Sequence, residues 1–579
     1  MPDHESIGLS SNDSYKNSPQ NPITTSDIMA NDTAIDRVMD KDPVAFVGDP
    51  EKGRFSGDDM DRIESNDEAS RMMSRALTGS QGIEEAALAD EGPLPAMGNG
   101  KPYPKPVGDR APYAVAFDGP NDPTHPHNWP TRTKVLYSLT IALATVSITF
   151  GSAMFSTATE VISRKFHIGE VTATLSTSLY VLGFASGPII WAPLSELYGR
   201  KIVLIPSCFG FVCFNFAVGT ARDIQTIMIC RFFAGFIGAA PMVVVPAALA
   251  DMFNAEFRGT AMNLFSMTVF GGPLLAPVIG GFIMKNSHMG WRWTCYITGL
   301  VGILSLLGIV FFLEETHHPL ILVQKARVLR RRTGNWGIHA PHEEFTISFK
   351  ELAEKNITRP LIMLFTEPIL LFISIYNAFI YGLLYLFLTA YPLIFAGGYG
   401  FGAGEAELPY VGMLIGMFIG GLMCMWWEQR FKATLAANGG KPIPEERLPP
   451  MMVGSIVFAG GIFWLCWAGN YPDKVHWIVP TIGGAPIGFG LISIFLPCIN
   501  YLVDCYLIFA ASALAGNTFL RSTFGAVFPL FATQMFKSMG INWAGTLLGC
   551  VALVLVPVPF LFYKYGPHFR ARSKYAFLL

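Results

Sequence analysis

The sequence predicts an all-α integral membrane protein with twelve transmembrane helices. The chain of 579 residues is 51% hydrophobic and only 15% charged, whereas a soluble domain has about 25% charged residues. It contains 57 glycines and 45 phenylalanines, and small residues allow membrane helices to approach one another closely. Twelve apolar segments of bilayer-spanning length follow residue 134.

The part before the first apolar segment, residues 1–134, is expected to be a disordered, acidic, cytoplasmic tail. Residues 1–100 hold 20 Asp and Glu against 8 Lys and Arg, and such a polar sequence buries too little apolar surface to fold. No cleavable signal peptide is expected, because the first apolar segment starts far from Met1.

Six apolar segments are expected on each side of a polar loop. The N-terminal half (135–313) has them at 135–158, 172–193, 202–219, 227–249, 261–284 and 294–313. A central cytoplasmic loop (314–367) leads to the C-terminal half (368–562), with segments at 368–396, 408–427, 451–468, 477–502, 505–534 and 541–562. A short basic tail (563–579) follows. Lys and Arg are concentrated on the side of both termini, which places both termini in the cytoplasm.

The second and third segments meet in GPIIWAPLSELYGRKIVLI, residues 187–205. The break between them is a tight turn, where Gly199 permits a positive φ and Arg200 and Lys201 indicate the cytoplasmic side. This stretch resembles the loop between helices two and three of major facilitator superfamily transporters. PLSELYGRK is similar to the form of that loop in fungal drug:proton antiporters.

The resemblance implies a major facilitator fold, with two six-helix halves, in which this loop is a cytoplasmic latch. The latch residues are expected to be Glu196, Gly199, Arg200, Lys201, Asp251 and Arg258. Glu196 would lie near a helix N-terminus of the other half, where negative charge is favoured. Asp251 would pair with Arg200 or Arg258 rather than carry a proton. The alternative is an ordinary turn with cytoplasmic charges.

The fifth segment contains GGPLLAPVIGG, residues 271–281, which resembles the antiporter motif of the same family. The matching residues are Gly272, Pro273, Pro277, Gly280 and Gly281. The prolines are expected to bend the helix and the glycines to bring a neighbouring helix into contact. The motif favours export over import, and packing alone is the alternative.

Two sets of residues are candidates for a substrate cavity. Arg521, near the middle of the eleventh segment, is costly to bury without a partner, and Asn517 lies one turn away on the same face. Asn377, Tyr381 and Tyr385 form a polar-aromatic stripe on the seventh segment. Structural bridging by Arg521 and helix packing by the stripe are the alternatives.

Arg231, in the fourth segment, is expected about one turn below the extracellular surface. The resemblance implies a role for it in proton coupling, and snorkelling to the surface is the alternative. No Asp, Glu or His lies near the middle of a predicted segment, so the sequence identifies no proton carrier. The lack of central acids also disfavours a polycationic substrate.

No catalytic residue, metal site or cofactor is predicted, since the sequence has no Walker loop and no HExxH motif. The resemblance implies an exporter of hydrophobic or amphipathic drugs, toxicants or secondary metabolites, driven by a proton gradient through alternating access. The expected partners are a small amphipathic organic substrate, protons and the lipid bilayer, with no nucleic acid.

We expect a monomer in the plasma membrane rather than the vacuolar membrane. Two alternatives remain for the function. One is an exporter of polyamines or other organic cations with the same fold. The other is a non-transporting membrane sensor that uses the acidic tail as its effector arm.

Overall fold

The structure is a computed structural model and describes residues 113–119, 121–333, 336–344, 357–439 and 443–576. All the described residues belong to one compact unit. The expected tail at 1–112 lies outside the described residues. The described chain is helical, apart from one isolated β-bridge between Ala114 and His339.

The N-terminal half consists of six helical spans, three of them divided by short breaks. They are α4 (Thr131–Met154) with η3 (Phe155–Ala158) and α5 (Thr159–Phe166), α6 (Glu170–Ser186) with α7 (Pro188–Tyr198), α8 (Arg200–Thr220), α9 (Ile224–Gly238) with α10 (Ala240–Met252), α11 (Ala255–Lys285) and α12 (Arg292–Phe312).

The C-terminal half repeats this number of spans after the short helix α15 (Arg359–Thr366). They are α16 (Pro368–Pro392) with η6 (Leu393–Gly398), η7 (Glu405–Glu407) with α17 (Tyr410–Ala437), α18 (Pro449–Gly469), α19 (Ile478–Tyr506), α20 (Ala510–Met539) and α21 (Ile541–Leu555) with α22 (Pro557–Arg572).

Ten of the described helices are long and apolar enough to cross a membrane, by length and composition. The pair α6 and α7, bent by 41°, adds an eleventh if it is one span. Helix α20 has 30 residues but is outside this set, because polar residues such as Asn517, Arg521 and Gln534 lower its hydropathy. With α20 counted, the described helices give the predicted six spans in each half.

Two of the interhelical turns consist of a single glycine. Gly199 separates α7 from α8 with φ 93°, and Gly540 separates α20 from α21 with φ 79°. Backbone at these φ values favours glycine, because a side chain would be strained there. The break in the predicted latch loop is therefore at Gly199 alone, whereas Glu196 lies within α7 and Arg200 begins α8.

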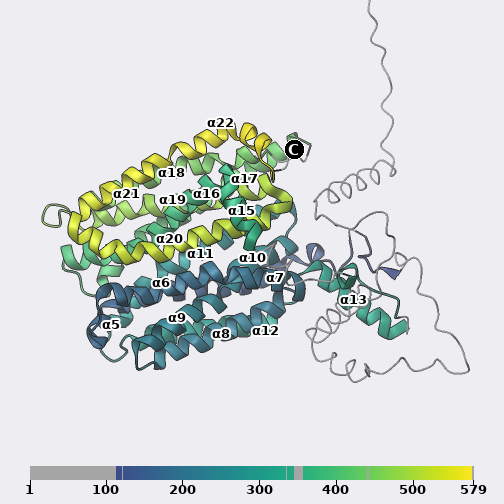
Figure 1. Cartoon of the computed structure of the whole chain (residues 1–579), viewed down its shortest axis with the longest axis horizontal. Coiled ribbons are helices and arrows are strands. Elements are labelled where there is room, and N and C mark those ends of the chain that lie inside the picture. The colour runs from purple at the N-terminus through teal and green to yellow at the C-terminus, as the bar shows by residue number, and fades with distance from the viewer. Residues whose placement is uncertain (1–112, 120, 334–335, 345–356, 440–442, 577–579) are drawn as a thin grey trace, which may run out of the picture. The chain divides into compact units, whose positions relative to one another are not determined.

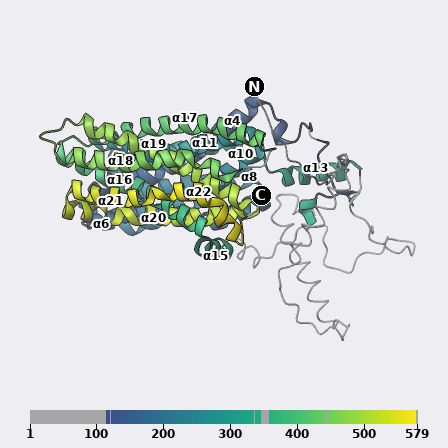
Figure 2. The same ribbon diagram turned by 90° about the horizontal axis from the view of Figure 1, so that it is seen from above.

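The two halves meet along two pairs of helices. Helix α20 packs against α6, and α11 packs against α17. Figure 1 shows the blue helices of the N-terminal half on one side and the green and yellow helices of the C-terminal half on the other, with α6, α11 and α20 between them. Figure 2 shows α17, α18, α19 and α21 running along the same direction.

Residues 113–119 and 121–130 differ from the expectation of a disordered tail. The backbone of Val115 donates to His339 in the central loop, and Asp122 accepts hydrogen bonds from Asp118 N and from both N and Oγ1 of Thr124. These bonds lower the pKa of Asp122. They give this short segment a fixed turn that its polar composition does not indicate.

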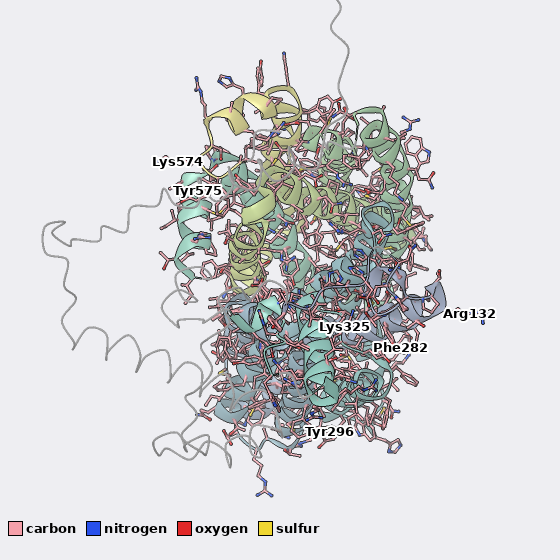
Figure 3. All side chains as sticks on the ribbon, turned by 90° about the vertical axis from the view of Figure 1, so that its right-hand side faces the viewer. Arg132, Phe282, Tyr296, Lys325, Lys574 and Tyr575 are labelled. Atoms are coloured by element: carbon pink, nitrogen blue, oxygen red, sulfur yellow. The ribbon has the colours of Figure 1, made fainter. Side chains whose placement is uncertain are left out.

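The central loop likewise contains a helix, α13 (His318–Thr333). On α13, Lys325, which Figure 3 labels, pairs with Asp118 at 2.8 Å. This pair fastens the N-terminal segment to the loop. In the C-terminal tail, α22 continues to Arg572, and Ser573 Oγ and Lys574 N donate to the carboxylate of the buried Glu367. The N-terminal segment is thus joined to the central loop, and the start of the C-terminal tail is held against the bundle.

Candidate functional site

Arg231 is buried inside the N-terminal half, where it joins three helices. Its guanidinium donates to the carbonyl oxygens of Gly151 at 2.9 Å, Ser152 at 3.3 Å and Ser176 at 3.4 Å. Because α9 begins at Ile224, Arg231 lies about two turns inside the helix. With 1% of its surface exposed, Arg231 does not snorkel to the surface, because the backbone carbonyls satisfy it internally.

A chain of polar contacts leads from Arg231 to the other half of the molecule. The hydroxyl of Ser152, on α4, lies 2.7 Å from the hydroxyl of Tyr385, on α16. Tyr385 in turn lies 3.5 Å from the hydroxyl of Tyr381. The ring of Tyr381 is 4.8 Å from the guanidinium carbon of Arg521. We refer to Arg231, Ser152, Tyr385, Tyr381 and Arg521 as the central polar chain.

Arg521 is buried like Arg231 but differs from it in its partners. Its guanidinium stacks near the rings of Tyr381 and Phe495, the latter at 5.1 Å. Its Nε has no hydrogen-bond partner among the described residues. Aromatic faces attract a cation, but they do not satisfy the guanidinium N–H groups.

Asn377 and Asn517 complete the centre of the C-terminal half. The two side chains are buried, and Asn377 Nδ2 donates to Asn517 Oδ1 at 3.2 Å. The other polar atom of each amide, Asn377 Oδ1 and Asn517 Nδ2, has no partner in the described part of the chain. The polar-aromatic stripe on α16 and the polar face of α20 therefore meet, as a shared cavity would require.

The predicted latch contains a buried ion pair. Arg200 Nε lies 3.0 Å from Asp251 Oδ2, and Arg200 Nη1 donates to Ser195 Oγ at 2.9 Å. Asp251 thus pairs with Arg200 and not with Arg258. The pair connects the start of α8 with the end of α10, inside the N-terminal half.

The carboxylate at the N-terminus of α8 belongs to Glu315, which the sequence analysis did not single out. It accepts hydrogen bonds from the backbone N–H groups of Arg200 at 2.8 Å and Lys201 at 3.1 Å, where the helix dipole favours negative charge. Glu196 lies on the exposed side of α7. The sequence did not indicate Glu315, because it lies 115 residues from Arg200. The expected place of Glu196, near a helix N-terminus of the other half, stays a prediction.

The antiporter motif lies on α11, which continues as one helix through Pro273 and Pro277. A Cβ placed on Gly272 would lie 2.1 Å from Thr149 Oγ1, and one on Gly280 would lie 2.6 Å from Thr157 Oγ1. One on Gly281 would lie 2.8 Å from the side chain of Glu407, in the other half. The motif therefore packs α11 against α4 and η3 on one side and against η7 on the other.

The outer ends of the two halves are joined by two ion pairs. Lys537 on α20 pairs with Glu170 on α6 at 2.9 Å, and Lys285 on α11 pairs with Glu405 on η7 at 2.7 Å. Behind the second pair lies Glu407, buried and with no partner for Oε2 among the described residues. Glu407 was missed because it immediately precedes the predicted eighth segment rather than lying within it.

Histidines gather around the latch, which the sequence analysis also did not foresee. The rings of His125 and His127 lie 4.4 and 5.2 Å from the ring of His318, whose Nε2 is 2.8 Å from the carbonyl oxygen of Asp251. Burial, followed by the charge of Arg200, lowers the pKa of His317 to about 3. Burial and the neighbouring His318 lower the pKa of His125 and of His127.

The comparison with protein families decides the class of this molecule. The profile of the Major Facilitator Superfamily matches residues 141–525. The chain belongs to the major facilitator superfamily. It is 62% identical to the "Major facilitator superfamily multidrug transporter FLU1" of Candida albicans, over 90% of this chain and 86% of that protein. It is 55% identical to the "Multidrug transporter TPO1_2" of Candida glabrata, over 89% of each chain.

Solved structures of major facilitator proteins share the fold. The proton:xylose symporter XylE bound to 6-bromo-6-deoxy-D-glucose matches with a TM-score of 0.55 and 14% identity, over 76% of this chain and 96% of that one. A partially occluded inward-open XylE from E. coli matches with a TM-score of 0.53 and 16% identity, over 75% and 98%. At these identities the likeness concerns the fold alone.

Major facilitator proteins place their substrate sites near the bilayer midplane, where the two repeats meet. The central polar chain lies at such a junction, since it runs from α9 and α4 in one half to α16 and α20 in the other. Among the described residues, no group of three or more His, Cys, Asp or Glu could hold a metal ion. The available chemistry at the centre is hydrogen bonding, aromatic contact and positive charge.

Proposed function

We propose that this major facilitator protein exports hydrophobic or amphipathic drugs, toxicants or secondary metabolites by alternating access, in exchange for protons. The observation that carries the proposal is the central polar chain, which crosses from one half to the other through the hydroxyls of Ser152 and Tyr385. A group bound there contacts both halves, so its binding energy changes when the halves rearrange. Only such differential affinity can couple a ligand to a conformational change.

Two further features support export of aromatic or amphipathic compounds. The ring of Phe270, on α11, lies 4.7 Å from Phe495 and 6.0 Å from Tyr381, which gives the polar chain an apolar wall. Sites that bind small molecules combine such walls with a few placed polar groups. The two multidrug transporters of Candida named above are similar to this chain over most of its length.

Glu407 is our candidate for the group that takes up the external proton. Three other acids are buried in the described part of the chain, and each has partners: Asp122 with Lys325, Glu367 with Ser573, and Glu445 with Arg570. Glu407 has none for Oε2. A buried carboxyl without a cation favours its neutral, protonated form, and separation of η7 from α11 would hydrate it and favour ionisation.

The test is export of Nile red, a neutral aromatic dye with a carbonyl acceptor, from cells that express the chain, with and without a protonophore. Export that stops with the protonophore, and that Arg521→Ala reduces without loss of the protein from the membrane, is expected. Export that continues unchanged without a proton gradient contradicts the antiport mechanism. A fluorescent fusion in the same cells tests the plasma-membrane location, and cross-linking in detergent tests the monomeric state.

A further inference from the structure

We infer that the substrates recognised at the centre carry an anionic or strongly hydrogen-bond-accepting group, which binds Arg521. This inference rests on the proposed export function and narrows its substrate class to amphipathic organic anions and acceptor-rich neutral compounds.

The centre carries two buried positive charges and faces no described carboxylate. The ionisable groups that act electrostatically on Arg521 are the hydroxyls of Tyr381 and Tyr385. Those that act on Arg231 are Tyr180, Cys295 and Tyr385. Each of these groups is a phenol or a thiol. Burying an arginine side chain within a bilayer without a partner carries a large free-energy cost.

Arg231 and Arg521 differ in how far the protein already satisfies them. Arg231 donates to three backbone carbonyl oxygens, so each of its three guanidinium nitrogens already makes a hydrogen bond within the structure. Arg521 has an unpartnered Nε, although only 4% of its surface is exposed. We therefore assign to Arg231 the role of cross-linking helices, and to Arg521 the role of receiving a ligand.

The amides beside Arg521 offer one more donor and one more acceptor. The hydrogen bond between Asn377 and Asn517 uses one polar atom of each side chain and leaves the other unpartnered. Reversing both amides exchanges their roles but still leaves one donor and one acceptor. A carboxylate that accepts from the guanidinium and from an amide N–H would match this set, because a guanidinium binds a planar carboxylate through two parallel hydrogen bonds.

The aromatic residues around Arg521 indicate the chemistry of the part of the ligand that does not bind the guanidinium. Arg521 lies close to the rings of both Tyr381 and Phe495, and the ring of Phe270 contacts both. A ligand that reaches the guanidinium therefore also meets aromatic faces, which favour a flat, apolar body. A polyamine lacks both the acceptor and the apolar body, and its charges would be repelled by the two arginines.

Binding of two xanthene dyes tests this inference directly. Fluorescein is anionic and rhodamine 6G is cationic, and the two share an aromatic ring system. Fluorescence anisotropy with the purified full-length protein in detergent should give tighter binding of fluorescein than of rhodamine 6G. Arg521→Gln should weaken fluorescein binding about tenfold or more, as loss of a hydrogen bond to a charged group predicts. Arg521→Lys should retain part of the affinity.

The control variant is Arg430→Gln, at an arginine on α17 that stacks on Trp426 outside the site, and it should bind both dyes as the unmodified protein does. A melting curve for each variant separates lost binding from lost folding. Equal affinity for the two dyes, unchanged fluorescein binding in Arg521→Gln, or displacement of fluorescein by spermidine would overturn the inference. Because binding is measured without a gradient, failure of proton-driven export in cells would contradict the proposed function separately.

Discussion

The hydroxyl oxygens of Ser152 and Tyr385 lie 2.7 Å apart and link α4 in the N-terminal half to α16 in the C-terminal half. Ser152 also holds Arg231 through its carbonyl oxygen, and Tyr385 contacts Tyr381. A rearrangement of the halves must therefore break or lengthen this hydrogen bond. Its position makes it a contact whose energy differs between conformations.

Replacement of Tyr385 by phenylalanine is expected to destabilise the structure by about 0.5–1.5 kcal/mol, the net contribution of a buried hydrogen bond. It should also change the rate of export, because the two halves lose a contact. The measurement is a melting curve together with dye export. Tyr391→Phe is the matched control: Tyr391 is on the same helix and buried, but its hydroxyl has no described partner, so no loss is expected. Equal effects of the two substitutions would contradict a role for the Ser152 contact.

Asp251→Asn should destabilise the latch by about 1–3 kcal/mol, because Arg200 would remain buried without its counter-charge. A lower melting temperature and slower export are expected. The control is Glu160→Gln, which removes the carboxylate of an exposed pair with Arg164, where an effect of at most about 0.5 kcal/mol is expected. A melting temperature for Asp251→Asn as high as that of the control would show that the pair does not stabilise the latch.

Gly272→Ala should be strongly disruptive, whereas Gly271→Ala in the same helix should be tolerated. The added methyl at 272 would lie 2.1 Å from Thr149 Oγ1 and 2.8 Å from Phe150 N, so the backbones of α11 and α4 must move apart. At 271 the nearest atom is Met417 Cε, at 3.5 Å. Overpacking of this kind costs about 1–3 kcal/mol. Expression, melting temperature and export measure the contrast, and similar behaviour of the two variants would refute it.

The pH dependence of stability should reflect His317. Its pKa in the folded protein is about 3, below the value of about 6.5 for an unperturbed histidine. Between these two pH values the unfolded state binds more protons than the folded state. The free energy of unfolding therefore decreases as the pH falls below about 6.5. His317→Gln should reduce the fall in melting temperature between pH 7.5 and pH 5.5 (about one unit to either side of that value), whereas the exposed His288→Gln should not. An unchanged pH profile for His317→Gln would contradict the buried neutral state.

The sequence predicted contacts within one helix better than contacts between distant helices. Arg521 and Asn517 could be placed together because they are one turn apart on the same helix. Asp251 could be limited to two partners, Arg200 and Arg258, because the sequence predicts all three at cytoplasmic helix ends. The Ser152–Tyr385 contact spans 233 residues. The helical period of an apolar segment does not say which of its hydroxyl groups faces the other half.

The same limit explains the residues at the ends of the helices. Glu315 and the histidines lie in polar stretches whose composition is that of solvent-exposed loops, so only tertiary contacts show that they pack on α8 and α10. Six spans in each half, by contrast, follow from the length of the apolar runs. Local composition therefore predicted the architecture, while the partners of the polar residues depend on how the helices are arranged.

Glu407→Gln should make export insensitive to external pH, if Glu407 takes up the external proton. The amide has nearly the size of the carboxyl but cannot ionise, so closing and opening of η7 against α11 would no longer involve a proton. Export by the unmodified protein should rise as the outside is acidified, and export by Glu407→Gln should be slower and constant. The matched control is Glu405→Gln, two residues away, which removes the half-exposed pair with Lys285 and should keep the pH response. A normal pH response of export in Glu407→Gln would exclude Glu407 as the site of proton uptake, because a glutamine side chain cannot take up the proton.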